Sequence, residues 1–161
     1  MEKHDQGLVY ELNIPLRDGA IQRTDDSELW ALRLSNAFPF SLNRVRWDLV
    51  PNHSVLSATP RSEQEKRDPE AYFRRCSPRI ARFLRACFAQ EGVSLEKELV
   101  WLGDSTSLVL HLTGSTFIIW SAAMLSYPQH SYLVPPDVTW CFNYTFEDEA
   151  YFGRRPPSEE L

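Results

Sequence analysis

One segment in the middle of this sequence constrains the fold more than any other, because its apolar residues follow the period of an α-helix. The apolar stripe consists of Ile80, Phe83, Leu84, Cys87 and Phe88. Ser77 is a good N-cap, Pro78 suits the first helical position, and Gly92 suits the position after the last turn. The sequence therefore predicts one main amphipathic helix over residues 78–91. A shorter helical segment over residues 69–75 is expected before it, since proline breaks the hydrogen bonding of a helix interior.

Segments in which apolar residues alternate with a period of two lie on both sides of this helix. Such alternation is typical of strands with one face in the core. On this alternation the predicted strands cover residues 7–16, 28–36, 44–50 and 138–146. The apolar segments 98–103, 107–114 and 115–122, which follow one another with short connections, are predicted as further strands. The charged interval before the helix is expected to be a loop, and short connections after the helix predict hairpins. About seven strands and one main amphipathic helix indicate the α+β class, with a mostly antiparallel sheet on which the helix packs.

Length and composition are those of one folded domain. The chain has 161 residues, of which 43% are hydrophobic, and this is enough for a substantial core. We predict a single domain over residues 1–152 and a disordered tail over 153–161. The three cysteines lack the spacing of a disulfide framework, no signal peptide pattern begins the chain, and no apolar run is long enough to cross a membrane. These features favour a cytoplasmic protein with no membrane partner.

Charge is distributed unevenly along the chain. Residues 61–85 contain eight Lys or Arg and four Asp or Glu, whereas the chain as a whole has a net charge of −5. A row of arginines shares one face of the predicted helix: Arg75, Arg79, Arg82 and Arg85. This row can be a solvated helix face, it can pair with acids of the same chain, or it can contact RNA. The acidic remainder of the chain disfavours a nucleic-acid partner, because phosphate binding requires a basic face.

No catalytic or ligand-binding motif is present in the sequence. The histidines and cysteines lack the spacing of metal ligands on one element, and no glycine-rich phosphate loop occurs. We therefore expect no enzyme activity, no cofactor and no metal site. The alternative is a small enzyme or ligand-binding domain with a pocket beside the sheet, and His111 or Cys141 would then be the reactive residue.

The stretch "YTFEDEAYF", residues 144–152, places three consecutive acids among aromatic residues near the end of the chain. It can be a strand end whose aromatic residues pack on the sheet. It can also be a contact surface, in which the acids steer a basic partner and the aromatic residues anchor it. A second acidic patch lies near residue 25. The predicted partner-binding residues are Glu147, Asp148, Glu149, Tyr151, Phe152, Asp25 and Asp26.

The chain resembles the bacterial immunity proteins that neutralise polymorphic toxins, including those of contact-dependent growth inhibition. The resemblance lies in the small acidic α+β chain, the tryptophan-bearing segments "ELVWLG" and "STFIIW", and the end "WCFNYTFEDEAYF". It implies a tight one-to-one complex in the cytoplasm with a cognate toxin domain, often a nuclease, whose active site the protein occludes. RNA binding through the arginine-bearing helix remains a further alternative, and the sequence leaves the oligomeric state open.

Overall fold

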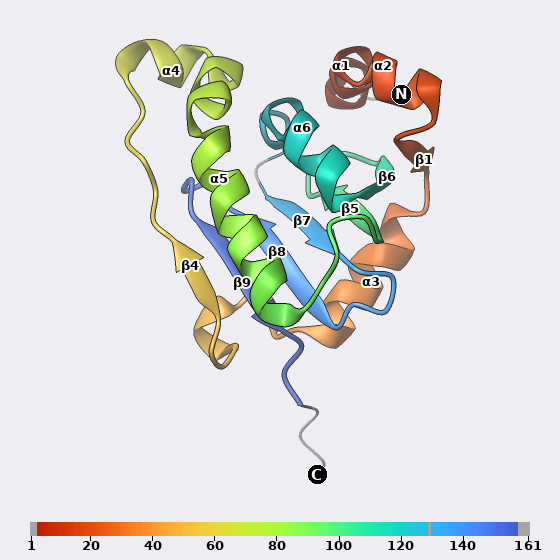
Figure 1. Cartoon of the computed structure of the whole chain (residues 1–161), viewed down its shortest axis with the longest axis vertical. Helices are drawn as coiled ribbons and strands as arrows, with labels where there is room; N and C mark the ends of the chain where they lie inside the picture. Colours follow the sequence, from red (N-terminus) through yellow and green to blue (C-terminus); the bar gives the residue numbers. More distant parts are fainter. Residues whose placement is uncertain (1–2, 129, 158–161) are drawn as a thin grey trace.

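The structure, a computed structural model, describes residues 3–128 and 130–157 of the chain. It consists of a seven-stranded antiparallel sheet with helices on both faces (Figure 1), which confirms the predicted α+β class. The strand order is β1-β6-β5-β7-β8-β9-β4. The strands are β1 (Gln22–Thr24), β4 (Ser54–Leu56), β5 (Glu98–Gly103), β6 (Val109–Thr113), β7 (Ser131–Val134), β8 (Trp140–Tyr144) and β9 (Ala150–Arg154). None of the helices within the described ranges has the length and hydropathy needed to cross a bilayer.

The main helix, α5 (Pro69–Glu91), is longer than the predicted one because it continues through Pro78. The side chain of Asp68 caps its first turn by accepting a hydrogen bond from the backbone N–H of Ala71 at 3.2 Å. The predicted break at Pro78 is wrong. Buried residues lie on both sides of this proline and pack on the same sheet, so the packing outweighs the lost hydrogen bond. The predicted end at Gly92 is confirmed, since its φ of 68° is left-handed.

One face of the sheet is covered by α5, α6 (Gly114–Leu125) and α1 (Lys3–Glu11), as Figure 1 shows. Four residues of the predicted stripe are buried in this core, while Phe83 is only partly buried against it. Strands β5, β6 and β8 confirm the strands predicted over the same residues. Trp140, Phe142 and Tyr144 point to this face together, as their alternation predicts.

The other face is covered by α3 (Ser27–Ala37), by a hairpin of β2 (Phe40–Ser41) and β3 (Arg44–Val45), and by a short 3₁₀ turn, η1 (Trp47–Leu49). Every residue of β7 and β8 is buried, because these strands have helical or hairpin cover on both sides. The predicted strand over residues 44–50 is therefore wrong beyond Val45, where the chain turns into η1.

Three other predicted strands are helices. Residues 7–16 belong to α1 and to α2 (Asn13–Asp18), residues 28–36 to α3, and residues 115–122 to α6. In α3 the buried residues Trp30 and Leu34 are separated by four positions, a spacing that fits a helix as well as a strand, while Leu32 between them is exposed. In α6 the residues are apolar on nearly all sides, so no period distinguishes the two structures.

Two further segments differ from the prediction. The expected loop before α5 contains a short helix, α4 (Glu63–Arg67), which begins with a capping box formed by Ser62 and Glu65. At the other end, β9 continues to Arg154, two residues past the predicted end of the domain. Residues 158–161 of the predicted tail lie outside the described residues.

Candidate functional site

The acidic stretch forms the tight turn between β8 and β9. Backbone hydrogen bonds close this turn, from Thr145 N–H to the carbonyl of Glu149 at 2.9 Å and from Asp148 N–H to the carbonyl of Thr145 at 3.0 Å. Asp148 has a φ of 62°, a left-handed conformation that aspartate tolerates better than most residues. The turn is thus a closed, hydrogen-bonded structure that holds the three acids in different environments.

The structure reverses the expected roles of two phenylalanines at this turn. Phe152 is buried, and its ring stacks on that of Trp140 with 5.2 Å between centroids, so it lies in the core and cannot anchor a partner at the surface. Phe146 belongs to the strand predicted over residues 138–146, but 58% of its surface is exposed. The reason is that β8 ends at Tyr144, so Phe146 leaves the strand alternation. Tyr151 is half-buried and its ring stacks on Trp47 at 5.4 Å.

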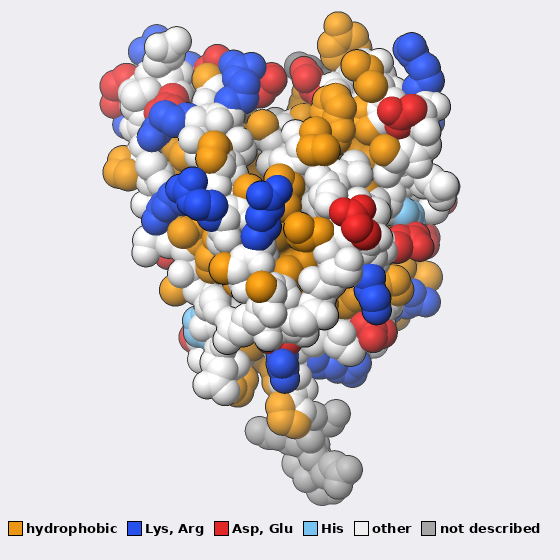
Figure 2. All heavy atoms as spheres, in the orientation of Figure 1, with side chains coloured by type: hydrophobic (Ala, Val, Ile, Leu, Met, Phe, Trp, Pro, Cys, Tyr) orange, Lys and Arg blue, Asp and Glu red, His pale blue; other side chains and the backbone are white. Residues whose placement is uncertain are grey.

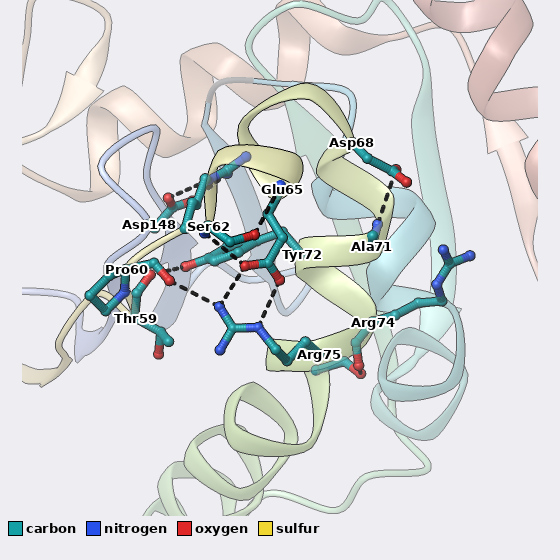
Figure 3. A network of polar contacts seen from close by, with 12 residues as sticks. Thr59, Pro60, Ser62, Glu65, Asp68, Ala71, Tyr72, Arg74, Arg75 and Asp148 are labelled. Carbon is teal, nitrogen blue, oxygen red and sulfur yellow. Dashed lines mark hydrogen bonds and ion pairs between the residues drawn. The ribbon is translucent and has the colours of Figure 1, made fainter.

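Asp148 faces inward and forms the strongest ion pair of the turn. Arg61 donates two hydrogen bonds to its carboxylate, each 2.7 Å long, and the Tyr144 hydroxyl donates a third at 3.3 Å. The guanidinium group of Arg61 also lies 4.2 Å from the ring centroid of Tyr72 on α5. The hydrogen bonds to Asp148 raise the pKa of Arg61. Asp148 therefore fixes the turn to the corner between α4 and α5, at the edge of the network in Figure 3.

We expect Asp148→Asn to lower the free energy of unfolding by about 1.5–3 kcal/mol, because a partly buried, charge-assisted pair with Arg61 is lost. Asparagine also tolerates the left-handed backbone, so the substitution tests charge rather than strain. Urea denaturation measures the effect. The control is Glu147→Gln, which removes only an exposed pair with Arg44 (3.4 Å) and should cost less than about 1 kcal/mol. Equal losses in the two variants would show that Asp148 has no special structural role.

The corner itself is held by Glu65. Its carboxylate accepts two hydrogen bonds from Arg75, at 2.7 and 2.9 Å, and one from the backbone N–H of Ser62 at 2.9 Å. Figure 3 shows Arg75 reaching back from α5 to this carboxylate. Arg75, followed by the Ser62 backbone, lowers the pKa of Glu65 to about 2.

This pKa makes the stability of the corner dependent on pH. The folded-state pKa of Glu65, about 2, lies below the ordinary value of 4.5, so its contribution is present above pH 4.5 and is lost as the pH falls toward 2. Thermal melts of the wild type and of Glu65→Gln, which keeps a capping side chain, should therefore converge across this window. A difference in melting temperature that stays constant down to acid pH would contradict the assignment.

Glu147 and Glu149 lie on the rim of a hollow of about 170 Å³, on the face of the sheet that α3 also covers. Its floor includes Trp47, whose indole N–H donates a 2.9 Å hydrogen bond to the buried side chain of Asn143. Two ion pairs cross the rim, Arg44 with Glu147 and Arg46 with Asp48. Positive charge thus partly balances the acids that the sequence indicated as a patch.

A second exposed turn, which the sequence did not predict, lies next to this hollow. It joins β2 to β3 through Leu42 and Asn43, and Arg44 beside it reaches Glu147 across the rim. Leu42 has 92% of its surface exposed. The sequence signal for this turn is Asn43, since asparagine is common in two-residue hairpins. Strands β2 and β3 have two residues each, which is too short to show an alternating pattern.

Asp25 and Asp26 lie at the opposite edge of the sheet, next to β1. Five strand spacings separate β1 from β9, about 24 Å, so the structure does not bring the two predicted acidic patches together. Asp26 accepts hydrogen bonds from the Thr24 hydroxyl at 2.5 Å and from the Trp30 indole at 3.2 Å, and these lower its pKa. Asp25 is exposed.

The predicted arginine row divides into two pairs. Arg75 binds Glu65, and Arg79 donates to the carbonyl of Ser57 and to the hydroxyl of Thr59, both at 2.7 Å. These two arginines tie α5 to the segment before it. Arg82 and Arg85 remain exposed. Figure 2 views the face of the molecule that carries α5, α6 and α1. Basic side chains lie over α4 and α5, and hydrophobic side chains lie over α6 and α1.

The two residues of the catalytic alternative, His111 and Cys141, lie in different settings. The Thr24 hydroxyl donates its proton to Asp26, so in its 3.1 Å contact with His111 the hydroxyl oxygen must accept a hydrogen bond from Nε2–H. In this arrangement His111 cannot act as a base toward Thr24. Cys141 is fully buried, and burial raises the pKa of its thiol well above the ordinary value. Among the described residues, no group of three or more His, Cys, Asp or Glu side chains could hold a metal ion.

No protein-family model matches the chain, and no curated protein matches its sequence.

Proposed function

We propose that this protein is an immunity protein, a non-enzymatic inhibitor that binds a cognate toxin domain and occludes its active site. One observation carries the proposal: backbone hydrogen bonds and the partly buried Arg61–Asp148 pair hold the acidic β8–β9 turn in place while it exposes Phe146 and Glu147. Arg61 binds the turn from the α4 side, and Arg44 adds an exposed, weaker pair from the β2–β3 hairpin. A surface that is fixed before binding loses little conformational entropy when a partner docks.

The composition of the turn suits a protein partner. An exposed aromatic residue supplies apolar contact area, and aromatic residues are common among the energetic centres of interfaces. Carboxylates beside it attract a basic surface from a distance and orient it during the encounter. A toxin that cleaves nucleic acid needs a basic cleft to bind phosphates, so a nuclease domain is the kind of toxin that this surface would fit.

The first experiment asks whether the protein neutralises a toxin. An immunity gene is expected to follow the gene of its toxin directly, so the toxin domain encoded by the preceding gene is expressed in a test host with and without this protein. We expect the protein to restore growth and to form a one-to-one complex with the purified domain in size-exclusion chromatography. Continued growth arrest, with both proteins folded and no complex formed, would refute the proposal.

Binding kinetics then test the surface. Glu147→Lys is expected to slow association with the toxin domain about tenfold or more at low salt, and less at high salt, because steering by exposed charges is screened. The matched control is Asp25→Lys, which makes the same change of charge at the far edge of the sheet. If both variants associate equally slowly, only the net charge of the protein matters and the turn is not the contact surface.

A further inference from the structure

We propose that the tip of the β2–β3 hairpin is the anchor of the partner interface, and that Leu42 inserts into an apolar socket bordered by Lys or Arg side chains on the partner. This inference rests on the proposed function, since it names the contact through which a protein partner is held. It concerns a segment that neither the charge pattern nor the aromatic pattern of the sequence indicates.

The backbone at this tip is unfavourable for the residue that occupies it. Leu42 and Asn43 have φ angles of 53° and 61°, and they form a two-residue connection between paired strands. Hairpins of this kind favour asparagine, aspartate or glycine at both positions, because a leucine side chain crowds the backbone in the left-handed region. Nevertheless, 92% of the surface of Leu42 is exposed to solvent. Neither backbone conformation nor core packing therefore accounts for a leucine here, and strained residues of this kind cluster at functional sites.

The hairpin below the tip is held firmly. Val45 is buried in the core of this face, and the backbone N–H of Arg46 donates a 2.8 Å hydrogen bond to the carbonyl of Pro39. Arg44 pairs with Glu147 on the neighbouring turn. A firmly held base lets an exposed apolar side chain bind without first becoming ordered.

The surroundings of the tip indicate the charge of the partner. A hollow of about 170 Å³ lies on the β8–β9 side of the hairpin, and one of about 280 Å³, lined by Phe40 and Leu34 among others, lies on the α3 side. The charged residues that line the two hollows are the acids Glu28, Asp48, Asp104, Glu147 and Glu149 and the bases Arg44 and Arg46. Five acids against two arginines leave a net charge of −3, so a basic rim on the partner complements this surface.

The first arm of the test measures stability without any partner. We expect Leu42→Asn to raise the melting temperature by about 2–4 °C, because asparagine relieves the strain of the left-handed position. The matched control is Ile119→Asn on α6, which also removes a large exposed apolar side chain but lies on the opposite face of the sheet. It should leave the melting temperature unchanged or lower it. If Leu42→Asn lowers the melting temperature, Leu42 supports the fold and the proposal is overturned.

The second arm measures binding with a displayed library of random linear peptides selected on the wild-type protein. We expect enriched peptides that combine Lys or Arg with large apolar residues, and we expect their affinity to fall about tenfold or more for Leu42→Asn but not for Ile119→Asn. A selection that yields no peptide dependent on Leu42, or a wild-type protein that self-associates through this tip, overturns the proposal. Because this arm uses no toxin, its failure is distinguishable from a failure of growth protection.

Discussion

Replacing Phe88 with alanine is expected to lower the free energy of unfolding by about 3–5 kcal/mol, the range for a fully buried phenylalanine. Phe88 is 1% exposed, and its ring lies 5.0 Å from that of Trp140 and 6.3 Å from that of Phe152. It also lies directly under α6, where a side-chain carbon at Gly114 would come within 3.0 Å of it. Removal of the ring therefore leaves a cavity where α5, α6 and the sheet meet. Urea denaturation monitored by tryptophan fluorescence measures the loss.

Phe83→Ala is the matched control for this prediction. The sequence places both phenylalanines in the same helical stripe, whereas the structure buries Phe88 fully and Phe83 only partly. Phe83 buries less apolar surface than Phe88, and solvent can fill the space that its ring leaves. The loss of free energy of unfolding for Phe83→Ala should therefore stay below about 2 kcal/mol. Equal losses for the two variants would contradict the packing of α5 described above.

Replacing Asn143 with leucine is expected to lower the free energy of unfolding by roughly 2–6 kcal/mol. Asn143 is 1% exposed; its carbonyl oxygen accepts from the Trp47 indole at 2.9 Å and its amide donates to the carbonyl of Ser131 at 3.0 Å. Leucine has nearly the same size but leaves both partners without a hydrogen bond, at about 1–3 kcal/mol each. The loss should be visible as a lower urea midpoint with an unchanged slope.

A double-mutant cycle with Trp47→Phe checks the origin of that loss. Trp47→Phe removes the indole donor, so the double variant no longer contains an unpaired N–H at this position. The double variant should therefore lose less free energy of unfolding than the sum of the two single-variant losses. Strict additivity would mean that the Trp47–Asn143 hydrogen bond contributes nothing. Trp47 also stacks on Tyr151 beneath the acidic turn, so partner affinity should be compared only among variants that remain folded.

The sequence by itself determined the parts of the fold in which local signals agree. In α5 the apolar stripe, the glycine after the last turn and the row of arginines on one face all indicate a helix, and only its starting point was misplaced. Strands β5, β6 and β8 were found because hydrophobic residues rich in β-branched and aromatic side chains stand between clear turns. One long helix and several neighbouring strands were sufficient to indicate the α+β class.

Tertiary structure decided the identity of the segments whose pattern suits two structures. Trp30 and Leu34 fit one face of a strand and one face of a helix equally well. The choice follows from the sheet, whose second face is apolar at Val100, Val109 and Cys141 and needs a covering helix. Only contacts distant in sequence contain this information.

The candidate site shows the same division. The sequence identified residues 144–152 as unusual, but it could not distinguish which of their side chains are available to a partner. Phe146 is exposed because β8 ends at Tyr144, and Phe152 is buried because it lies on the inward face of β9. Arg61, 87 residues away, turns Asp148 inward. Exposure and charge pairing depend on distant segments that the folded sheet brings together, and for this reason the sequence could locate the turn while only the structure could separate its surface from its core.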